Sequence, residues 1–136
     1  MSDVMQFDAG DFVHLGLGAT VESLPRHTGE MEWYAGYGQA HASDGVEGRL
    51  VAMWTFDESW DSWEMHPKGA ELVLCVAGSI SLTQESPDGD VNTTRIEAGQ
   101  AVVNEPGVWH TADVEPGASA TVVFITAGEG TEHRPR

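Results

Sequence analysis

A short stretch that carries acidic and histidine side chains, next to the most apolar run of the chain, is the first place to look for chemistry. In "WEMHPKGAELVLCVAG", residues 63–78, Glu64 and His66 are two residues apart, and Glu71 opens an apolar run that ends at Gly78. Burying ionisable groups beside such a run is costly unless an opposite charge compensates them. A cation held between these side chains would supply that charge.

Strand geometry predicts that these side chains converge. Residues two apart in a strand project to the same side, so Glu64 and His66 share a face. Glu71 starts the next expected strand, and His110 opens a later one after a Pro-Gly turn. Two imidazoles with one or two carboxylates are a usual ligand set for a borderline divalent ion. We therefore predict a metal site at strand edges, with Glu64, His66, Glu71 and His110 as its ligands.

The elements that position these residues are expected to be β-strands, because helical periodicity is almost absent. Short runs suited to strands alternate with Gly, Pro and Asp-Gly turns, which predicts an all-β sandwich or barrel with at most short helical turns. The clearest expected strands are 49–56, 71–77, 79–85, 91–97, 100–104 and 120–127, and weaker candidates are 11–17, 20–24 and 32–39.

The run 71–77 is apolar on both faces. Alternation places Glu71, Val73 and Cys75 on one side, and Leu72, Leu74 and Val76 on the other. One face is expected to point into a barrel. The other has to be covered, either by the N-terminal strands or by a partner subunit. This pattern favours a homodimer.

Two motifs make the chain resemble a small single-domain cupin of the conserved β-barrel type. The first cupin motif has the form G-x5-H-x-H-x(3–4)-E-x6-G, and its spacing is kept by His66, Glu71 and Gly78. The second has the form G-x5-P-x-G-x2-H-x3-N, and its spacing is kept by Gly99, Gly107 and His110. The resemblance implies a double-stranded β-helix, or jelly-roll barrel, in which these motif residues bind one metal ion that small substrates meet.

The chain departs from the cupin pattern in ways that affect the metal. Glu64 stands in place of the first motif histidine, so the ligands are either two histidines and two glutamates, or His66, Glu71 and His110 alone with open positions. The expected cofactor is one divalent transition metal, Mn, Fe, Ni or Zn, and oxygen ligands favour Mn(II) or Fe(II) over Cu. The remaining differences are minor: residues 61–63 lack the usual glycine, and Glu105 and Val114 replace the motif proline and asparagine.

Other residues that could do chemistry have simpler interpretations. The histidines at 14, 27, 41 and 133 lack motif spacing and are expected at the surface or in ordinary hydrogen bonds. Trp54 lies on the strand before the first motif, where it either lines the pocket mouth or packs in the core. Three acids, Asp57, Glu58 and Asp61, form a solvated turn or, at the entrance, would favour a neutral or cationic ligand. The C-terminal segment "GEGTEHRPR" either frays in solvent or docks on a partner, and fraying is the expectation for a terminus.

Length and composition limit the function classes. With 136 residues the chain is expected to be one cupin domain, residues 1–136, in which N-terminal strands (about 1–48) cover the barrel or the dimer interface. A net charge of −16 argues against nucleic acid and membrane partners. The single cysteine excludes an internal disulfide, and the start of the chain does not resemble a secretory signal, so we expect a cytoplasmic protein.

Two functions fit this sequence. One is a metal-dependent enzyme, such as an oxygenase or isomerase, acting on a small organic molecule at the metal. The alternative is a non-catalytic module that binds or senses a small ligand in a cavity that is empty or free of metal. No second acid or base stands out, so the sequence assigns no catalytic residue and no substrate.

Overall fold

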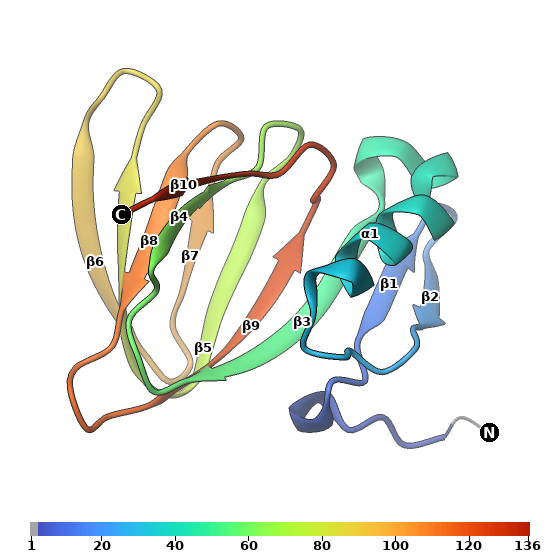
Figure 1. The fold of residues 1–136 in the computed structure, drawn as a ribbon, viewed down its shortest axis with the longest axis horizontal. Helices are drawn as coiled ribbons and strands as arrows, with labels where there is room; N and C mark the ends of the chain where they lie inside the picture. Colours follow the sequence, from blue (N-terminus) through green and yellow to red (C-terminus); the bar gives the residue numbers. More distant parts are fainter. Residues whose placement is uncertain (1–2) are drawn as a thin grey trace.

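A closed arrangement of antiparallel strands forms the body of the protein, as a computed structural model that describes residues 3–136 shows (Figure 1). The strands are β1 (Val13–Gly16), β2 (Thr20–Ser23), β3 (Arg49–Phe56), β4 (Ser62–Met65), β5 (Glu71–Glu85), β6 (Val91–Glu97), β7 (Ala101–Asn104), β8 (Trp109–Asp113), β9 (Ala120–Thr126) and β10 (Glu132–Pro135). One α-helix, α1 (Met31–Ala40), and two 3₁₀ segments, η1 (Phe7–Ala9) and η2 (Ala42–Glu47), complete it. The prediction of an all-β fold is confirmed.

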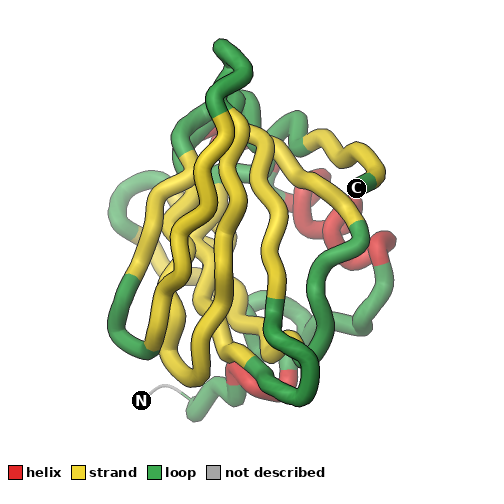
Figure 2. Tube along the Cα trace, turned by 90° about the vertical axis from the view of Figure 1, so that its left-hand side faces the viewer, coloured by secondary structure: helices red, strands yellow, loops and turns green. Residues whose placement is uncertain are grey.

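The order of hydrogen-bonded neighbours is β10-β4-β8-β5-β9-β3-β1-β2, and β6 and β7 also pair with β5. Strand β5 therefore belongs to both layers of the barrel. Its first half pairs with β7 and β9, and its second half pairs with β6 and β8. Figure 2 shows the strands wrapped around a common interior, with the helical segments at the periphery.

Gly78 is where β5 passes from one layer to the other. Its φ is +71°, a left-handed conformation that residues with a Cβ rarely adopt. The register of β5 with β9 also shifts just before it, between Cys75 and Ala77. A Cβ at position 78 would lie 2.0 Å from the carbonyl oxygen of Ser119, so the close approach of the backbones also requires glycine. The two runs predicted as separate strands are consequently one bent strand.

The core follows the alternation read from the sequence. Glu71, Val73 and Cys75 are buried on the inner face of β5, whereas Val76 on the outer face is 42% exposed. The interior is completed by apolar side chains from strands on both layers, among them Ile80, Leu82, Ile96, Ala112, Val122 and Phe124. The free cysteine is part of this core, where burial raises the pKa of its thiol. It behaves as a small apolar side chain.

The weak prediction of a strand at residues 32–39 is wrong, because these residues belong to the helix α1. Aromatic and glycine residues in "MEWYAGYGQA" suit a strand locally. In the folded chain, however, residues at helical spacing face the same cavity, including Met31, Tyr34, Ala35 and Gly38. Tertiary contact on one side of the segment thus overrides its local preference. The expectation of only short helical turns is wrong for the same reason.

The N-terminal strands extend the barrel at one edge, where β1 pairs with β3 and β2 pairs with β1. A small second apolar cluster holds them in place, built on Phe12, Leu50 and Ala52. Within residues 3–136, no helix has the length and apolar character needed to span a membrane.

We expect Gly78→Ala to lower the free energy of unfolding by more than about 3 kcal/mol, because it adds a steric clash to the cost of a left-handed conformation. Gly99→Ala is the matched control, since Gly99 has a φ of +87° and its Cβ would meet no atom within 4 Å. That variant should lose only about 1–2 kcal/mol. Urea unfolding measures both, and equal losses would show that the close approach to Ser119 has no energetic role.

Candidate metal centre

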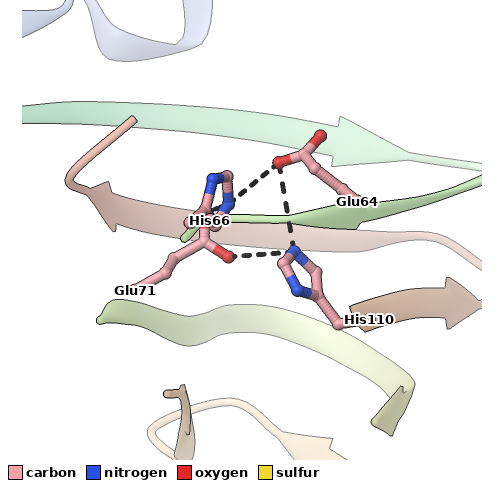
Figure 3. A group of neighbouring side chains, drawn as sticks. All are labelled: Glu64, His66, Glu71 and His110. Carbon is pink, nitrogen blue, oxygen red and sulfur yellow. Dashed lines mark ion pairs between the residues drawn. The ribbon is translucent and has the colours of Figure 1, made fainter. Parts of the chain in front are cut away.

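The four predicted ligands come from three strands and meet inside the barrel (Figure 3). Glu64 lies on β4, His66 follows the end of this strand, and Glu71 is the first residue of β5. His110 lies on β8 and is the cross-strand partner of Glu64. The barrel closure therefore brings together residues that are up to 46 positions apart in the sequence.

One ligand atom from each of the four side chains lies within 4.8 Å of the other three, and among residues 3–136 this is the only such group. The Nε2 atom of His66 lies 3.1 Å from an oxygen of Glu64 and 3.2 Å from one of Glu71. The Nε2 atom of His110 lies 3.3 Å from Glu71 and 3.9 Å from Glu64. Each imidazole nitrogen thus faces both carboxylates.

The contacts between these groups are not aligned as hydrogen bonds. The Nε2 atoms of His66 and His110 are buried and have no hydrogen-bond partner, although carboxylate oxygens lie close by. Buried polar atoms without partners are rare, because each costs about 1–3 kcal/mol. Nitrogens and oxygens directed at a shared point, instead of at one another, are the arrangement that a bound cation needs. The donor set therefore fits a divalent metal ion.

The other ring nitrogen of each histidine has a partner that fixes its protonation. The Nδ1 atom of His66 lies 2.8 Å from the hydroxyl of Thr131, which donates its own proton to the carbonyl of Gly128. That hydroxyl can therefore only accept from His66. The Nδ1 atom of His110 donates to the carbonyl of Val108 at 3.3 Å. Both neutral rings consequently carry their proton on Nδ1, which leaves the Nε2 lone pairs free for a metal.

Glu71 is held by hydrogen bonds at both carboxylate oxygens. Asn104 donates to Oε1 at 3.0 Å, and Thr126 donates to Oε2 at 2.6 Å. The side-chain amide of Gln84 donates to the carbonyl oxygen of Asn104 at 2.7 Å, which orients the amide of Asn104 toward Glu71. Asn104 and Thr126 thus fix the orientation of the Glu71 carboxylate, and Gln84 fixes that of Asn104.

Glu64 is less enclosed than the other three residues. Its side chain is 29% exposed, and its Oε2 atom lies 3.1 Å from the Nε2 atom of His133 on β10. Burial opposes the ionisation of Glu64, but the close imidazole of His66, together with those of His110 and His133, outweighs it and lowers the pKa of Glu64. His133, expected to be an ordinary surface or hydrogen-bonded histidine, is the hydrogen-bonded neighbour of this predicted ligand.

The two central histidines differ in their electrostatics. Burial disfavours the charged form of His66, but Glu64 and Glu71 together outweigh this and raise its pKa to about 9. At His110 burial prevails and lowers the pKa. The two carboxylates thus stabilise one positive charge at His66, while a second positive charge at His110 is disfavoured. Positive charge is favourable at this point of the barrel.

A cavity of about 1150 Å³ opens beside the four residues, and Glu64, His66 and Glu71 lie in its wall. Strand β3 contributes Leu50, Ala52, Trp54 and Phe56, and α1 contributes Tyr34 and Tyr37. Of the three acids ahead of the site, Glu58 and Asp61 line this cavity. Trp54 lies in the cavity wall and also packs edge-on against Phe12 of the core, with ring centroids 5.3 Å apart.

The C-terminal segment, expected to fray, is instead strand β10, which pairs with β4. Arg134 lies between Trp63 and Trp109, with its guanidinium 4.9 Å and 4.5 Å from the ring centroids, and it forms an ion pair with Glu85. Arg136 pairs with Asp113 at 2.8 Å. Cation–π and ionic contacts therefore hold the strand that brings His133 to Glu64.

Several residues of the site could not be found by reading motifs. Those that orient the ligands are Gln84, Asn104, Thr126, Thr131 and His133. Asn104 and Thr126 are the cross-strand partners of Glu71, so the register would have identified them once the strand pairing was known. The other histidines, 14, 27 and 41, lie in the N-terminal region and do not belong to the group of four, although His14 and His41 line the same cavity.

Comparison with known proteins gives the fold. No family model matches the sequence, and no curated protein does either. Solved structures that match include an oxalate oxidase (TM-score 0.53, 16% identity, covering 61% of this chain and 44% of that one) and an oxalate oxidase in complex with the substrate analogue glycolate (0.54, 14%, 62% and 45%). A tryptophan-to-phenylalanine variant of the B. subtilis oxalate decarboxylase also matches (0.56, 14%, 72% and 26%).

The chain spans less than half the length of these structures. At such low identity the likeness concerns the fold, and it shows that the chain has the cupin fold which the two motifs predicted.

We expect Thr131→Val to weaken the affinity for a divalent ion about 10- to 100-fold, because it removes the acceptor that keeps the proton of His66 on Nδ1. Thr131→Ser keeps the hydroxyl and should retain an affinity within about threefold of the parent. Competition titration of Zn(II) against a chromogenic chelator measures both variants. An unchanged affinity in the valine variant would mean that Thr131 does not orient His66.

Proposed function

We propose that this protein binds one divalent transition metal inside its barrel, and that a small organic molecule binds or reacts at that metal. Glu64, His66, Glu71 and His110 are the proposed ligands. The observation that carries the proposal is the pair of buried Nε2 atoms, at His66 and His110, that have no hydrogen-bond partner and face two carboxylates. Without a metal, the buried Nε2 atom of His110, where burial lowers the pKa, would lack a partner, and that of His66 would face two carboxylates without an aligned hydrogen bond.

The ligand set indicates which metals to test first. Two nitrogens and two carboxylate oxygens suit Mn(II), Fe(II), Ni(II) or Zn(II), and the oxygen content favours Mn(II) or Fe(II) over Cu. Glu64 is the most exposed of the four and shares its second oxygen with His133. It is therefore the ligand best placed to yield its position to an incoming molecule.

The residues of the chain prepare this site in three ways. Thr131 and Val108 keep the Nε2 lone pairs of the neutral histidines available, and Asn104 and Thr126 orient the carboxylate of Glu71. Apolar and aromatic side chains of the cavity wall line the space beside the group, where a small molecule can bind. A metal bound here would act as a Lewis acid that polarises an oxygen of the bound molecule.

The names of the fold neighbours refer to oxalate, but their low identity and greater length leave the substrate of this chain open. The activity is also open, because a cavity beside four possible ligands does not define a reaction. The enzyme requires the proposed metal and the alternative ligand-binding module does not, so the metal is the first feature to test.

Removal of either histidine is expected to lower the metal content most. His66→Ala and His110→Ala should each retain less than about a tenth of the metal, whereas Glu64→Ala should alter metal preference more than content. His27→Ala is the matched control, because it removes an imidazole that belongs neither to the group of four nor to the cavity wall. Elemental analysis after loading the untagged proteins with Mn(II), Fe(II), Ni(II) or Zn(II) gives the comparison. Full occupancy in both histidine variants would contradict the assignment.

Bound metal should also raise the free energy of unfolding, by about 2.7 kcal/mol at a free metal concentration of 100 times Kd. The ligands are scattered in the unfolded chain, so the ion binds the folded state. If the parent protein takes up none of the four metals, a metal-free ligand-binding module becomes the better account.

We further propose that the protein forms a homodimer through the outer face of β5. Leu72 lies beside Val103 and Ile125 on the neighbouring strands, and Leu74 lies beside Val123. Val76 and Val103 on this face are 42% and 46% exposed. A contiguous apolar face on several strands is a usual feature of subunit interfaces.

Light scattering of the parent protein at micromolar concentration should give the mass of a dimer. Val103→Lys should give a monomer, because it places a charge within the apolar face. Val91→Lys is the matched control, since Val91 on β6 is also exposed, at 58%, but belongs to a different strand pair. A monomeric parent protein would contradict the proposal.

A further inference from the structure

We propose that the cavity beside the metal group takes a small organic cation, a protonated amine with a flat apolar body. The inference rests on the proposed function, because it names the class of molecule for the same cavity. Three features of the cavity wall support it: its charge, its aromatic side chains, and the direction in which its polar groups are fixed.

The charged side chains of the wall, apart from His66, are acidic. Five carboxylates line the cavity: Glu58, Asp61, Glu64, Glu71 and Glu129. Within residues 3–136, no lysine or arginine lines it. Four of the six basic side chains are in ion pairs elsewhere: Arg26 with Asp11, Arg95 with Glu97, Arg134 with Glu85, and Arg136 with Asp113.

A bound divalent ion does not reverse this charge. It would compensate Glu64 and Glu71, whose oxygens face the two imidazoles, and would leave three carboxylates of the wall uncompensated. Glu58 and Asp61 lie in the loop before β4, and Glu129 lies in the loop before β10, so two separate loops supply them. All three are exposed, where they act on molecules that enter from solvent. Such a field attracts cations and repels anions.

Aromatic rings form much of the wall. Tyr34, Tyr37, Trp54, Phe56 and Trp60 all line the cavity. Phe56 and Trp60 pack together with ring centroids 5.6 Å apart, and Phe56 packs edge-on against Phe124 at 6.1 Å. Ring faces attract organic cations through their quadrupole, and flat apolar groups pack well between them.

At the α1 end of the cavity, hydrogen bonds orient the hydroxyl of Tyr37 so that its oxygen can accept a hydrogen bond from a ligand. His14 is 3% exposed, and its two ring nitrogens lie 2.6 Å from Asp44 and 2.6 Å from the hydroxyl of Tyr37. The carboxylate of Asp44 can only accept, so a neutral ring carries its proton on Nε2 and accepts the Tyr37 proton at Nδ1. The hydroxyl oxygen of Tyr37 is then left with lone pairs, which suit an ammonium donor.

Glycine makes room for this arrangement. A Cβ at Gly48 would lie 2.7 Å from Cε1 of His14, and one at Gly16 would lie 3.1 Å from a carboxylate oxygen of Asp44. The pair of His14 and Asp44 therefore fills a space that larger residues would close. The three exposed carboxylates of the wall, Glu58, Asp61 and Glu129, form an acidic rim. This rim, the aromatic side chains and the hydroxyl of Tyr37 all favour a ligand that is positively charged and donates hydrogen bonds.

Three phenols that differ in charge test this inference. Tyramine, tyrosol and 4-hydroxyphenylacetate share the ring and carry an ammonium, a hydroxyl and a carboxylate group. Isothermal titration calorimetry with the Zn(II)-loaded protein at 150 mM salt should rank their affinities in that order. Tyramine should bind at least about tenfold more tightly than 4-hydroxyphenylacetate, because the carboxylates of the cavity wall attract its ammonium group and repel the carboxylate of the other ligand.

The acidic rim should be responsible for the preference. The triple variant Glu58→Gln, Asp61→Asn, Glu129→Gln is expected to reduce the tyramine preference to about threefold or less and to keep its Zn(II) content. The control variant Asp90→Asn, Glu105→Gln, Glu115→Gln removes the same charge from exposed positions outside the cavity wall and should keep the tenfold preference.

Equal or tighter binding of the carboxylate by the Zn(II)-loaded parent protein would overturn the inference, as would the absence of binding by all three phenols. A preference that survives in the triple variant would also overturn it. The Zn(II) content separates this result from the proposed function: failure to hold zinc contradicts the metal site, whereas a wrong order of affinities with zinc retained contradicts only the ligand class.

Discussion

Two carboxylates and two imidazoles meet inside the barrel, three of the four side chains being buried, and the rest of the structure is arranged around that charge. Glu71 is 2% exposed, His66 3% and His110 0%. Both oxygens of Glu71 and the Nδ1 atom of each histidine have protein partners, but the two Nε2 atoms have none. The protein fixes every atom of this group except those that face its centre, which is the arrangement of a site built for a cation.

The barrel can build such a group because one strand belongs to both of its layers. Gly78 bends β5, whose first residue is Glu71 and whose second half carries Gln84 next to His110. The cross-strand partners Asn104 and Thr126 then meet Glu71 from either side. Strand pairing, which satisfies the backbone, therefore also orients the polar side chains of the site.

The segments outside the central barrel complete the site and its surroundings. Strand β10 is held by Arg134 between two tryptophans and brings His133 to Glu64, and the loop before it supplies Thr131. Helix α1 adds aromatic side chains to the cavity wall, next to the acids of the loop before β4. The N-terminal and C-terminal parts of the chain thus supply side chains that set the charge and shape of the site. The cupin fold alone does not set them, because it occurs with many activities.

The sequence by itself determined the all-β fold, most strand positions and the group Glu64, His66, Glu71 and His110, because alternation, turn residues and motif spacing are local properties of the chain. Only the tertiary structure decided which side chains orient that group, that 31–40 is helical and that the C-terminus forms a strand. Each of these depends on partners far away in sequence: Thr131 lies 65 positions from His66, and Arg134 lies 49 positions from Glu85. A contact that forms only when the barrel closes leaves no periodic pattern in the sequence, so it could not be predicted from it.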